Sequence, residues 1–209
     1  MSVEDRQRWD DRYRQASTAI EPRPPVALEL SGIAVPTGGR ALDVACGSGS
    51  VSVWLAQRGF EVLGVDVSPV ALAAARDLAS AHGVDGTAGK TDGTLARIDG
   101  TATRKAAGSA RFEAIDLDDG LPRGDGELGR WDLVVCQRFR DPAHYADLAA
   151  AVAPGGLLVI TVLSTVGHVG DPGPFRAVPG ELVGAFGGVL DILWSSEADG
   201  ESHLVARRP

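Results

Sequence analysis

The segment that most constrains the fold of this chain is a short apolar run followed by a glycine turn. The apolar run covers residues 41–45 (Ala-Leu-Asp-Val-Ala), and the turn covers residues 46–49 (Cys-Gly-Ser-Gly). A second apolar run, residues 62–66 (Val-Leu-Gly-Val-Asp), ends in an acid. A strand, a glycine turn, a helix and a second strand build a crevice of nucleotide size at the carboxyl edge of an α/β sheet. We expect the functional site at this edge.

The same alternation of strands and helices continues along the chain. Strands are expected at residues 41–45, 61–66, 112–116, 131–136, 157–162, 189–194 and 203–206, and helices at 3–16, 50–58, 69–82, 141–153 and 179–186. This order favours a parallel sheet with right-handed crossovers. The 209 residues are enough for one domain with a full core. We therefore predict one domain over residues 1–209, in which residues 1–39 form a helical lid and a linker.

One stretch, residues 85–110, has a different texture. It is rich in Gly, Ala and Thr, carries scattered charges and shows no sustained apolar period. Such a composition predicts a flexible surface insertion. A loop that gates the substrate site is the alternative.

The net charge and the hydropathy of the chain argue against two classes of binding partner, nucleic acids and membranes. The formal net charge of −8 repels a phosphate backbone, and no basic stripe offsets it, which argues against a nucleic-acid partner. No apolar run approaches the roughly 20 residues that cross a bilayer, and the charged start of the chain lacks the apolar core of a secretion signal. We expect a cytoplasmic protein with no membrane partner, whose Cys46 and Cys136 are reduced thiols.

Three acids mark the edge where the site is expected. Asp43, Asp66 and Asp116 lie in or at the ends of three successive strands, and the carboxyl ends of parallel strands face the same edge. Gly47 and Gly49 allow the backbone to pass close to a ligand. The acid that ends the second strand is placed to accept two hydrogen bonds from a ribose diol.

A dinucleotide site is the main competitor. Its G-x-G-x-x-G pattern lacks the last glycine here, because residues 47–52 read Gly-Ser-Gly-Ser-Val-Ser. Asp43 would also repel a pyrophosphate beside the turn, whereas a ligand with a cationic sulfur and an ammonium group suits it. A nicotinamide-dependent oxidoreductase and a plain glycine turn without a ligand stay open as alternatives.

These residues resemble the class I S-adenosylmethionine-dependent methyltransferases. Leu42–Gly49 is similar to their first motif, Gly64–Ser68 to the second and Ala114–Leu117 to the third, and Ala153–Leu157 is similar to the turn before their fifth strand. The resemblance covers about residues 40–161.

A looser similarity extends to the small-molecule branch that includes tellurite-resistance and thiopurine-type methyltransferases. It rests on residues 9–13 (Trp-Asp-Asp-Arg-Tyr) and 179–182 (Pro-Gly-Glu-Leu). The resemblance implies a Rossmann-like, doubly wound sheet of seven strands, mostly parallel with one antiparallel strand, and helices on both faces.

The resemblance also implies contacts to S-adenosylmethionine. Asp43 and the backbone of residues 45–49 would face the methionine part, and Asp66 the ribose hydroxyls. Asp116 and Leu117 would contact the adenine, on which Val67 would pack. The full set of expected cofactor-binding residues is Trp9, Tyr13, Asp43, Ala45, Cys46, Gly47, Gly49, Asp66, Val67, Asp116, Leu117 and Cys136.

The implied reaction is an in-line displacement on an activated methyl group, for which a dedicated base is optional. Arg138 and Arg140 could hold an anionic or phenolate acceptor, and His168 could take a proton; surface placement is the alternative for each. The four histidines lack the spacing of metal ligands, so no metal is expected.

Two departures bear on the acceptor. Residues 135–138 (Val-Cys-Gln-Arg) lack the Asn or Asp followed by Pro-Pro and an aromatic residue of DNA amino-methyltransferases, and Cys136 lacks the preceding proline of cytosine-C5 enzymes. We expect a methyltransferase for a small acceptor, through oxygen, nitrogen, sulfur or a metalloid. The alternatives are an NAD(P)-dependent oxidoreductase and a non-catalytic, cofactor-binding regulatory domain. The oligomeric state does not follow from the residues.

Overall fold

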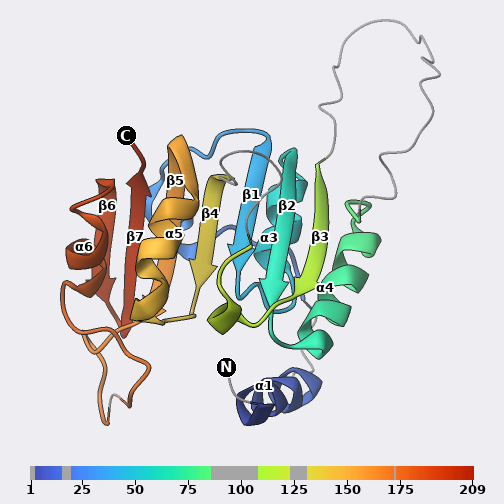
Figure 1. Ribbon diagram of the computed structural model, residues 1–209, viewed down its shortest axis with the longest axis horizontal. Coiled ribbons are helices and arrows are strands. Elements are labelled where there is room, and N and C mark those ends of the chain that lie inside the picture. Colours follow the sequence, from blue (N-terminus) through green and yellow to red (C-terminus); the bar gives the residue numbers. More distant parts are fainter. Residues whose placement is uncertain (1–2, 16–19, 86–107, 123–130, 172) are drawn as a thin grey trace, which may run out of the picture.

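The computed structural model describes residues 3–15, 20–85, 108–122, 131–171 and 173–209. Seven strands form one sheet in the order β3-β2-β1-β4-β5-β7-β6 (Figure 1). The strands are β1 (Gly39–Val44), β2 (Phe60–Asp66), β3 (Ser109–Ala114), β4 (Trp131–Gln137), β5 (Val152–Leu163), β6 (Asp191–Ala198) and β7 (Glu201–Arg207). The pairs from β3 to β5 are parallel, and β7 runs antiparallel to both of its neighbours. The predicted fold class is confirmed.

Helices cover both faces of this sheet. The helices are α1 (Val3–Gln15), α2 (Val26–Ser31), α3 (Ser50–Ala56), α4 (Pro69–Ala81), α5 (Tyr145–Ala151) and α6 (Glu181–Phe186), with short 3-10 turns η2 (Leu117–Asp119) and η3 (Pro142–His144). One buried cluster joins α2, α3 and α4 to the sheet, and the other joins α5 and α6 to it. Helix α1 belongs to neither layer and lies beyond the edge at which the parallel strands end (Figure 1).

Local sequence signals explain the elements that border this edge. Ser68 caps α4: its Oγ accepts a hydrogen bond from the Ala71 N–H at 3.2 Å, and Pro69 occupies the first turn, where its missing N–H costs nothing. In β5, residues 157–162 are all buried, as expected for a strand covered on both faces.

The connection from α5 to β5 differs from the single helix predicted over residues 141–153. The segment divides into η3 and α5, and β5 begins at Val152. Trp131 pairs with Val152 but Leu133 pairs with Leu157, so the intervening residues bulge from the ladder. Gly155 has φ +75°, and its N–H donates to the Arg208 carbonyl at 2.8 Å. The Pro-Gly-Gly sequence thus ends the helix and supplies the bulge.

The end of the predicted insertion belongs to the sheet. Ser109 and Ala110 pair with Glu61 and Val62 of β2, so β3 begins before residue 112 and the insertion ends earlier than expected. Residues 86–107, which hold most of the predicted insertion, lie outside the described residues. Neither the surface insertion nor the gating loop is therefore tested.

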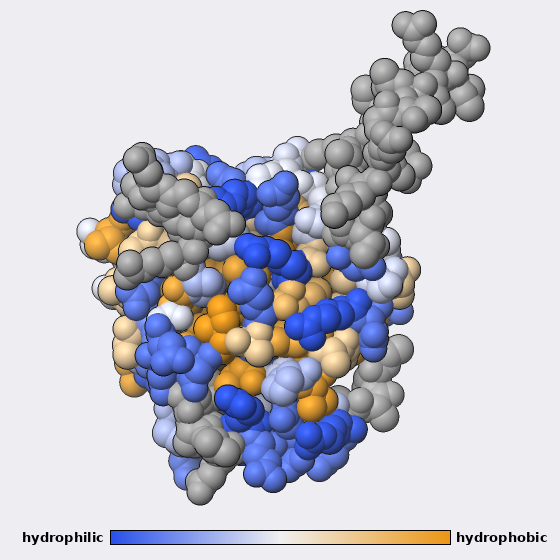
Figure 2. All heavy atoms as spheres, turned by 45° about the vertical axis from the view of Figure 1, so that its right-hand side comes forward, coloured by the Kyte–Doolittle hydropathy of each residue, from blue (hydrophilic) through white to orange (hydrophobic). Residues whose placement is uncertain are grey.

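The surface is mixed in polarity. In the face shown in Figure 2, apolar side chains gather in the middle and hydrophilic side chains surround them. Within the part of the chain that the structure describes, none of the helices combines the length and the apolar character needed to cross a membrane.

Candidate active site

A cavity of about 720 Å³ lies along the edge at which the parallel strands end. Its volume falls within the roughly 300–1,000 Å³ of small-molecule sites. The lining residues are Trp9, Arg12, Tyr13, Ile20, Arg23, Asp43, Ala45, Cys46, Gly47, Ser48, Ser50, Val51, Asp66, Val67, Leu117, Gln137, Arg138, Phe139, Leu163 and Glu201. The turns after β1, β2 and β3 build one half, and β4, β5 and β7 build the other. Because β7 is antiparallel, its first residue, Glu201, pairs with Leu163 at the end of β5 and reaches the same edge.

Asp66 ends β2 and is 7% exposed. Its Oδ2 accepts the Gly47 N–H and its Oδ1 accepts the Ser68 N–H, both at 2.9 Å. Burial raises the pKa of Asp66, which these backbone donors partly oppose. A carboxylate has about four acceptor positions, so two remain for hydroxyl donors from the cavity.

Asp43 lies deeper, near the end of β1, and is 2% exposed. Its Oδ2 accepts the Ser52 Oγ–H at 2.6 Å. Burial raises the pKa of Asp43 from 3.8 to about 7, against the opposing hydrogen bond from Ser52. Asp43 and Asp66 thus form an acidic floor that suits a cation and disfavours a pyrophosphate.

The turn between β1 and α3 has backbone φ values that residues other than glycine rarely adopt. Ala45, Gly47 and Gly49 have φ values of +54°, +53° and +77°. A Cβ on Gly47 would lie 2.6 Å from the Tyr13 hydroxyl, so glycine allows α1 to approach the turn. A Cβ on Gly49 would lie 2.7 Å from the Ala75 Cβ, and Gly49 does not line the cavity. It therefore serves the packing of α3 against α4.

Helix α1 covers the cavity at this turn. The Ser68 hydroxyl donates a short hydrogen bond to Asp10, which anchors α1 to the start of α4. Trp9 and Tyr13 line the cavity with ring centroids 6.2 Å apart. Burial and the neighbouring Asp66 raise the pKa of Tyr13, so its hydroxyl is protonated at neutral pH. The structure therefore brings the two predicted lid aromatics to the site.

Arg138 lines the other half, immediately after β4. Its φ is +57°, in the left-handed region that non-glycine residues rarely adopt. Its Nη2 and Nε lie 2.8 Å and 2.9 Å from Glu201 Oε1. Arg138 is therefore in the cavity as predicted, but its charge is already paired.

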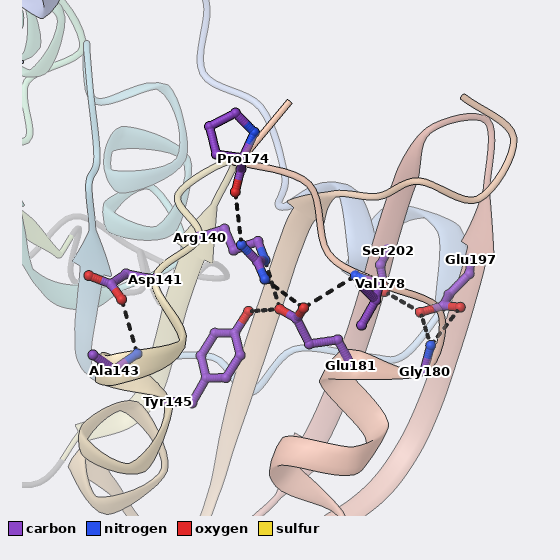
Figure 3. A network of polar contacts seen from close by, with 10 residues as sticks. All are labelled: Arg140, Asp141, Ala143, Tyr145, Pro174, Val178, Gly180, Glu181, Glu197 and Ser202. Atoms are coloured by element: carbon purple, nitrogen blue, oxygen red, sulfur yellow. Dashed lines mark hydrogen bonds and ion pairs between the residues drawn. The ribbon is translucent and has the colours of Figure 1, made fainter. Parts of the chain in front are cut away.

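Arg140 lies outside the cavity lining, contrary to its expected contact with an acceptor. Figure 3 shows its guanidinium paired with Glu181 at the start of α6, at 2.8 Å and 2.7 Å. The Tyr145 hydroxyl donates to the same carboxylate at 2.7 Å. These interactions fix the turn after β4 to α6, so Arg140 has a structural role.

His168 also lies outside the cavity lining, so the structure does not bring it to the site where a proton acceptor was expected. It sits in the loop after β5, and its Nε2 lies 3.3 Å from the Asp171 carbonyl of the same loop. Asp116 follows β3 by two residues and caps η2 by accepting the Asp118 N–H at 3.1 Å. It is not a lining residue, although Leu117 is.

The two cysteines differ in position. Cys46 lines the cavity, and burial raises the pKa of its thiol. Cys136 is fully buried in β4, where its Sγ lies 3.5 Å from the Phe139 carbonyl, and burial raises its pKa to about 12. Cys136 is therefore a core residue and not the cofactor contact that we expected. Both cysteines are free, as predicted.

One group of side chains among the described residues could hold a metal ion. Ligand atoms of Asp118, Asp141 and His144 lie within 4.8 Å of one another outside the cavity lining. Asp141 is also occupied as the cap of η3, where its Oδ1 accepts the Ala143 N–H at 3.0 Å. The group has no role in the site described here.

The sequence reasoning missed three charged lining residues: Arg12, Arg23 and Glu201. The Arg12 guanidinium lies over the Trp9 ring, 5.3 Å from its centroid. No hydrogen bond or ion pair joins the Arg23 guanidinium to any residue that the structure describes, which leaves it available to an anionic group of a ligand. A proline-rich linker gives no signal for such a role, and Glu201 reaches the site only through the position of β7.

Comparisons with known proteins agree with this geometry. Residues 41–96 match a family model described as a methyltransferase domain. This part of the chain is similar to a methyltransferase domain. S-adenosylmethionine is the cofactor of the class I methyltransferases that its motifs resemble, and the matched residues contain the glycine turn, Asp43 and Asp66.

Individual relatives are similar to parts of this chain. The ribosomal RNA small subunit methyltransferase C of Alcanivorax borkumensis is 44% identical over 48 residues, 23% of this chain and 15% of the relative. An uncharacterized methyltransferase of Synechocystis sp. is 42% identical over 141 residues, 65% of this chain and 52% of the relative. The chain thus matches about half or less of these relatives' length. The crystal structure of TehB from Haemophilus influenzae has the same fold, with a TM-score of 0.61, 15% identity and coverage of 98% of this chain and 67% of that chain.

Proposed function

We propose that this protein transfers a methyl group from S-adenosylmethionine to a small-molecule acceptor through oxygen, nitrogen, sulfur or a metalloid. The observation that carries the proposal is the cavity in which the glycine turn, Asp43 and Asp66 converge beside a second half that is lined by Gln137, Arg138, Phe139, Leu163 and Glu201. The similarity of residues 41–96 to a methyltransferase domain supports the choice of cofactor.

The residues of the first half fit this cofactor. Asp66 would accept hydrogen bonds from the ribose hydroxyls with its two remaining acceptor positions. Asp43 would stabilise the cationic sulfur and ammonium groups, and Arg23 would pair with the carboxylate of the methionine part. Val67 and Leu117 would pack against the adenine.

The second half would hold the acceptor. When bound, the cofactor supplies a methyl group that is already activated, so alignment and exclusion of water can provide most of the acceleration. No histidine is among the cavity's lining residues. Trp9 and Tyr13 would exclude water by covering the cavity, while Phe139 and Leu163 would provide apolar contacts for the acceptor.

A small acceptor is favoured over a nucleic acid by charge. The formal net charge is −8, and three carboxylates line the cavity beside three arginines, so a phosphate backbone gains little attraction here. The match to a ribosomal RNA methyltransferase makes an RNA fragment an essential competitor in any acceptor screen.

Calorimetry with S-adenosylhomocysteine tests the cofactor half. We expect binding by the wild type and at least a tenfold loss in Asp66→Ala, because hydrogen bonds to a charged group contribute about 1.5–3 kcal/mol each. Asp77→Ala, a change at an exposed aspartate of α4, is the matched control. Tight NADH binding without S-adenosylhomocysteine binding would refute the proposal in favour of an oxidoreductase.

A screen with labelled S-adenosylmethionine tests the acceptor half. Thiols, phenols, heterocycles, tellurite and ribosomal RNA fragments are compared for methyl incorporation. Incorporation into a small molecule supports the proposal, whereas incorporation into RNA alone contradicts the small-molecule assignment. Cofactor binding without incorporation into any substrate would favour a regulatory domain.

A further inference from the structure

The charges in the acceptor half of the cavity neutralise each other. Among the lining residues from β4, β5 and β7, the charged ones are Arg138 and Glu201. Two nitrogens of Arg138 converge on Glu201 Oε1 at 2.8 Å and 2.9 Å. Phe139 and Leu163 add apolar surface to this half.

The backbone on both sides holds this pair in place. The Arg138 N–H donates to the Thr161 carbonyl at 2.7 Å, with Arg138 itself at a positive φ of 57°. Strained backbone of this kind persists only where the surroundings enforce it, and it is frequent at functional sites.

Glu201 follows a turn that is tied to the loop after β5. The Ser164 N–H donates to the Gly200 carbonyl and the Gly200 N–H donates to the Val166 carbonyl, both at 2.8 Å. The Glu201 side chain is only 20% exposed, while that of Arg138 is 68% exposed. The carboxylate is therefore the less exposed member of the pair, and the guanidinium pairs with it from the exposed side of the cavity lining.

We propose that the Arg138–Glu201 pair selects the charge of the acceptor, admitting uncharged aromatic molecules with a hydroxyl or ring nitrogen and excluding anions. This inference rests on the proposed methyltransferase function. An anion that contacts the remaining N–H groups of Arg138 would lie close to the Glu201 carboxylate, which repels it. A cation that approaches Glu201 would be repelled by the guanidinium of Arg138. A neutral ring can pack against Phe139 and Leu163 and form one hydrogen bond with the ion pair.

This role differs from that of an ordinary surface ion pair. Arg111 and Glu113 of β3 form a pair of similar length, 2.9 Å, with both side chains exposed at 58% and 47%, and neither residue lines the cavity. Such a pair contributes little. The Arg111–Glu113 pair therefore provides a control: it is also an arginine–glutamate ion pair, but it lies outside the cavity.

Three probes of similar shape and different charge test the inference. The binding of 2-naphthol, 2-naphthoate and 2-naphthylmethylamine is measured by ligand-observed NMR at pH 7, with and without saturating S-adenosylhomocysteine. We expect the wild type to bind 2-naphthol at least tenfold more tightly than 2-naphthoate. Glu201→Gln should raise the affinity for 2-naphthoate at least tenfold because it frees Arg138, while Glu113→Gln should change neither affinity.

A second variant tests the same inference independently if Glu201→Gln does not fold. Arg138→Gln leaves the Glu201 carboxylate without its arginine, with only His203 Nε2 at 3.8 Å as an ion-pair partner among the described residues, and should raise the affinity for 2-naphthylmethylamine at least tenfold.

Three results would overturn the inference: equal wild-type affinity for 2-naphthol and 2-naphthoate, no binding of 2-naphthol, or unchanged charge preference in the folded variants. S-adenosylhomocysteine binding together with any of these results refutes the acceptor inference alone. If the wild type does not bind S-adenosylhomocysteine, the proposed function itself is refuted.

Discussion

We predict that replacing the buried carboxylate of Asp43 has opposite effects on the stability of the fold and on the affinity of the site for its cofactor. Asp43 is 2% exposed and receives one side-chain hydrogen bond, from Ser52. Burial raises its pKa from 3.8 to about 7. The folded protein therefore stabilises the protonated form of Asp43 relative to the ionised form.

The size and sign of the effect follow from this shift. Above pH 7, Asp43 is ionised in both the folded and the unfolded chain, and the full cost of burying its charge is present. As the pH falls from about 7 to 3.8, the folded protein takes up the proton first and the cost disappears. A shift of about three pH units corresponds to about 4 kcal/mol, at 1.36 kcal/mol for each unit.

Asp43→Asn removes this pH dependence because asparagine does not ionise. We expect the free energy of unfolding of the variant, minus that of the wild type, to be larger at pH 8 than at pH 4.5 by about 3 kcal/mol, because about 1 kcal/mol of the cost is still present at pH 4.5. At pH 8 the variant should be more stable than the wild type by about 1–3 kcal/mol. The gain is smaller than about 4 kcal/mol because the buried amide of asparagine lacks an acceptor for its N–H groups. Affinity for S-adenosylhomocysteine should nevertheless fall, since the proposed site uses the negative charge.

Urea unfolding at pH 8, 6.5 and 4.5 measures these free energies for the wild type, Asp43→Asn and the control Asp77→Asn, which removes an exposed carboxylate of α4. A difference between Asp43→Asn and the wild type that stays constant within about 0.5 kcal/mol across this pH range would falsify the reasoning, because a group with this shift must contribute more than that.

The same assay tests two other positions. Gly49→Ala should lower the free energy of unfolding by about 2–4 kcal/mol, because alanine is strained at φ +77° and its Cβ would lie 2.7 Å from that of Ala75; Gly184→Ala, with nothing within 4 Å of the added Cβ, should not be destabilising. Equal losses at the two glycines would contradict this account. Arg140→Met should cost about 2–4 kcal/mol at pH 7, because it leaves the carboxylate of Glu181, 13% exposed, without its cation. Arg140 lowers the pKa of Glu181 below 4.5, so the pair contributes fully above that pH and its contribution is lost as the pH falls through the lower folded value; a deficit in Arg140→Met that does not shrink below pH 4.5 would exclude this pair as its cause.

The sequence determined the sheet and the half of the cavity that we propose for the cofactor. Apolar runs of strand length that alternate with helical segments specify parallel strands, and the acid that ends a strand must lie at the carboxyl edge. Asp43, Asp66 and the glycine turn were therefore predictable, since each depends on neighbours close in the chain. Trp9 and Tyr13 were found through the resemblance and not through periodicity.

Only the tertiary structure decided the acceptor half. Arg140 pairs with Glu181 and Arg138 with Glu201, partners 41 and 63 residues away in the chain. Glu201 reaches the cavity because β7 runs antiparallel beside β5, whereas His168, in a loop that follows the same edge, does not reach it. Local periodicity fixes which residues form a strand, but the order and direction of strands depend on packing across the whole sheet. Charges that pair across such an arrangement therefore become visible only in three dimensions.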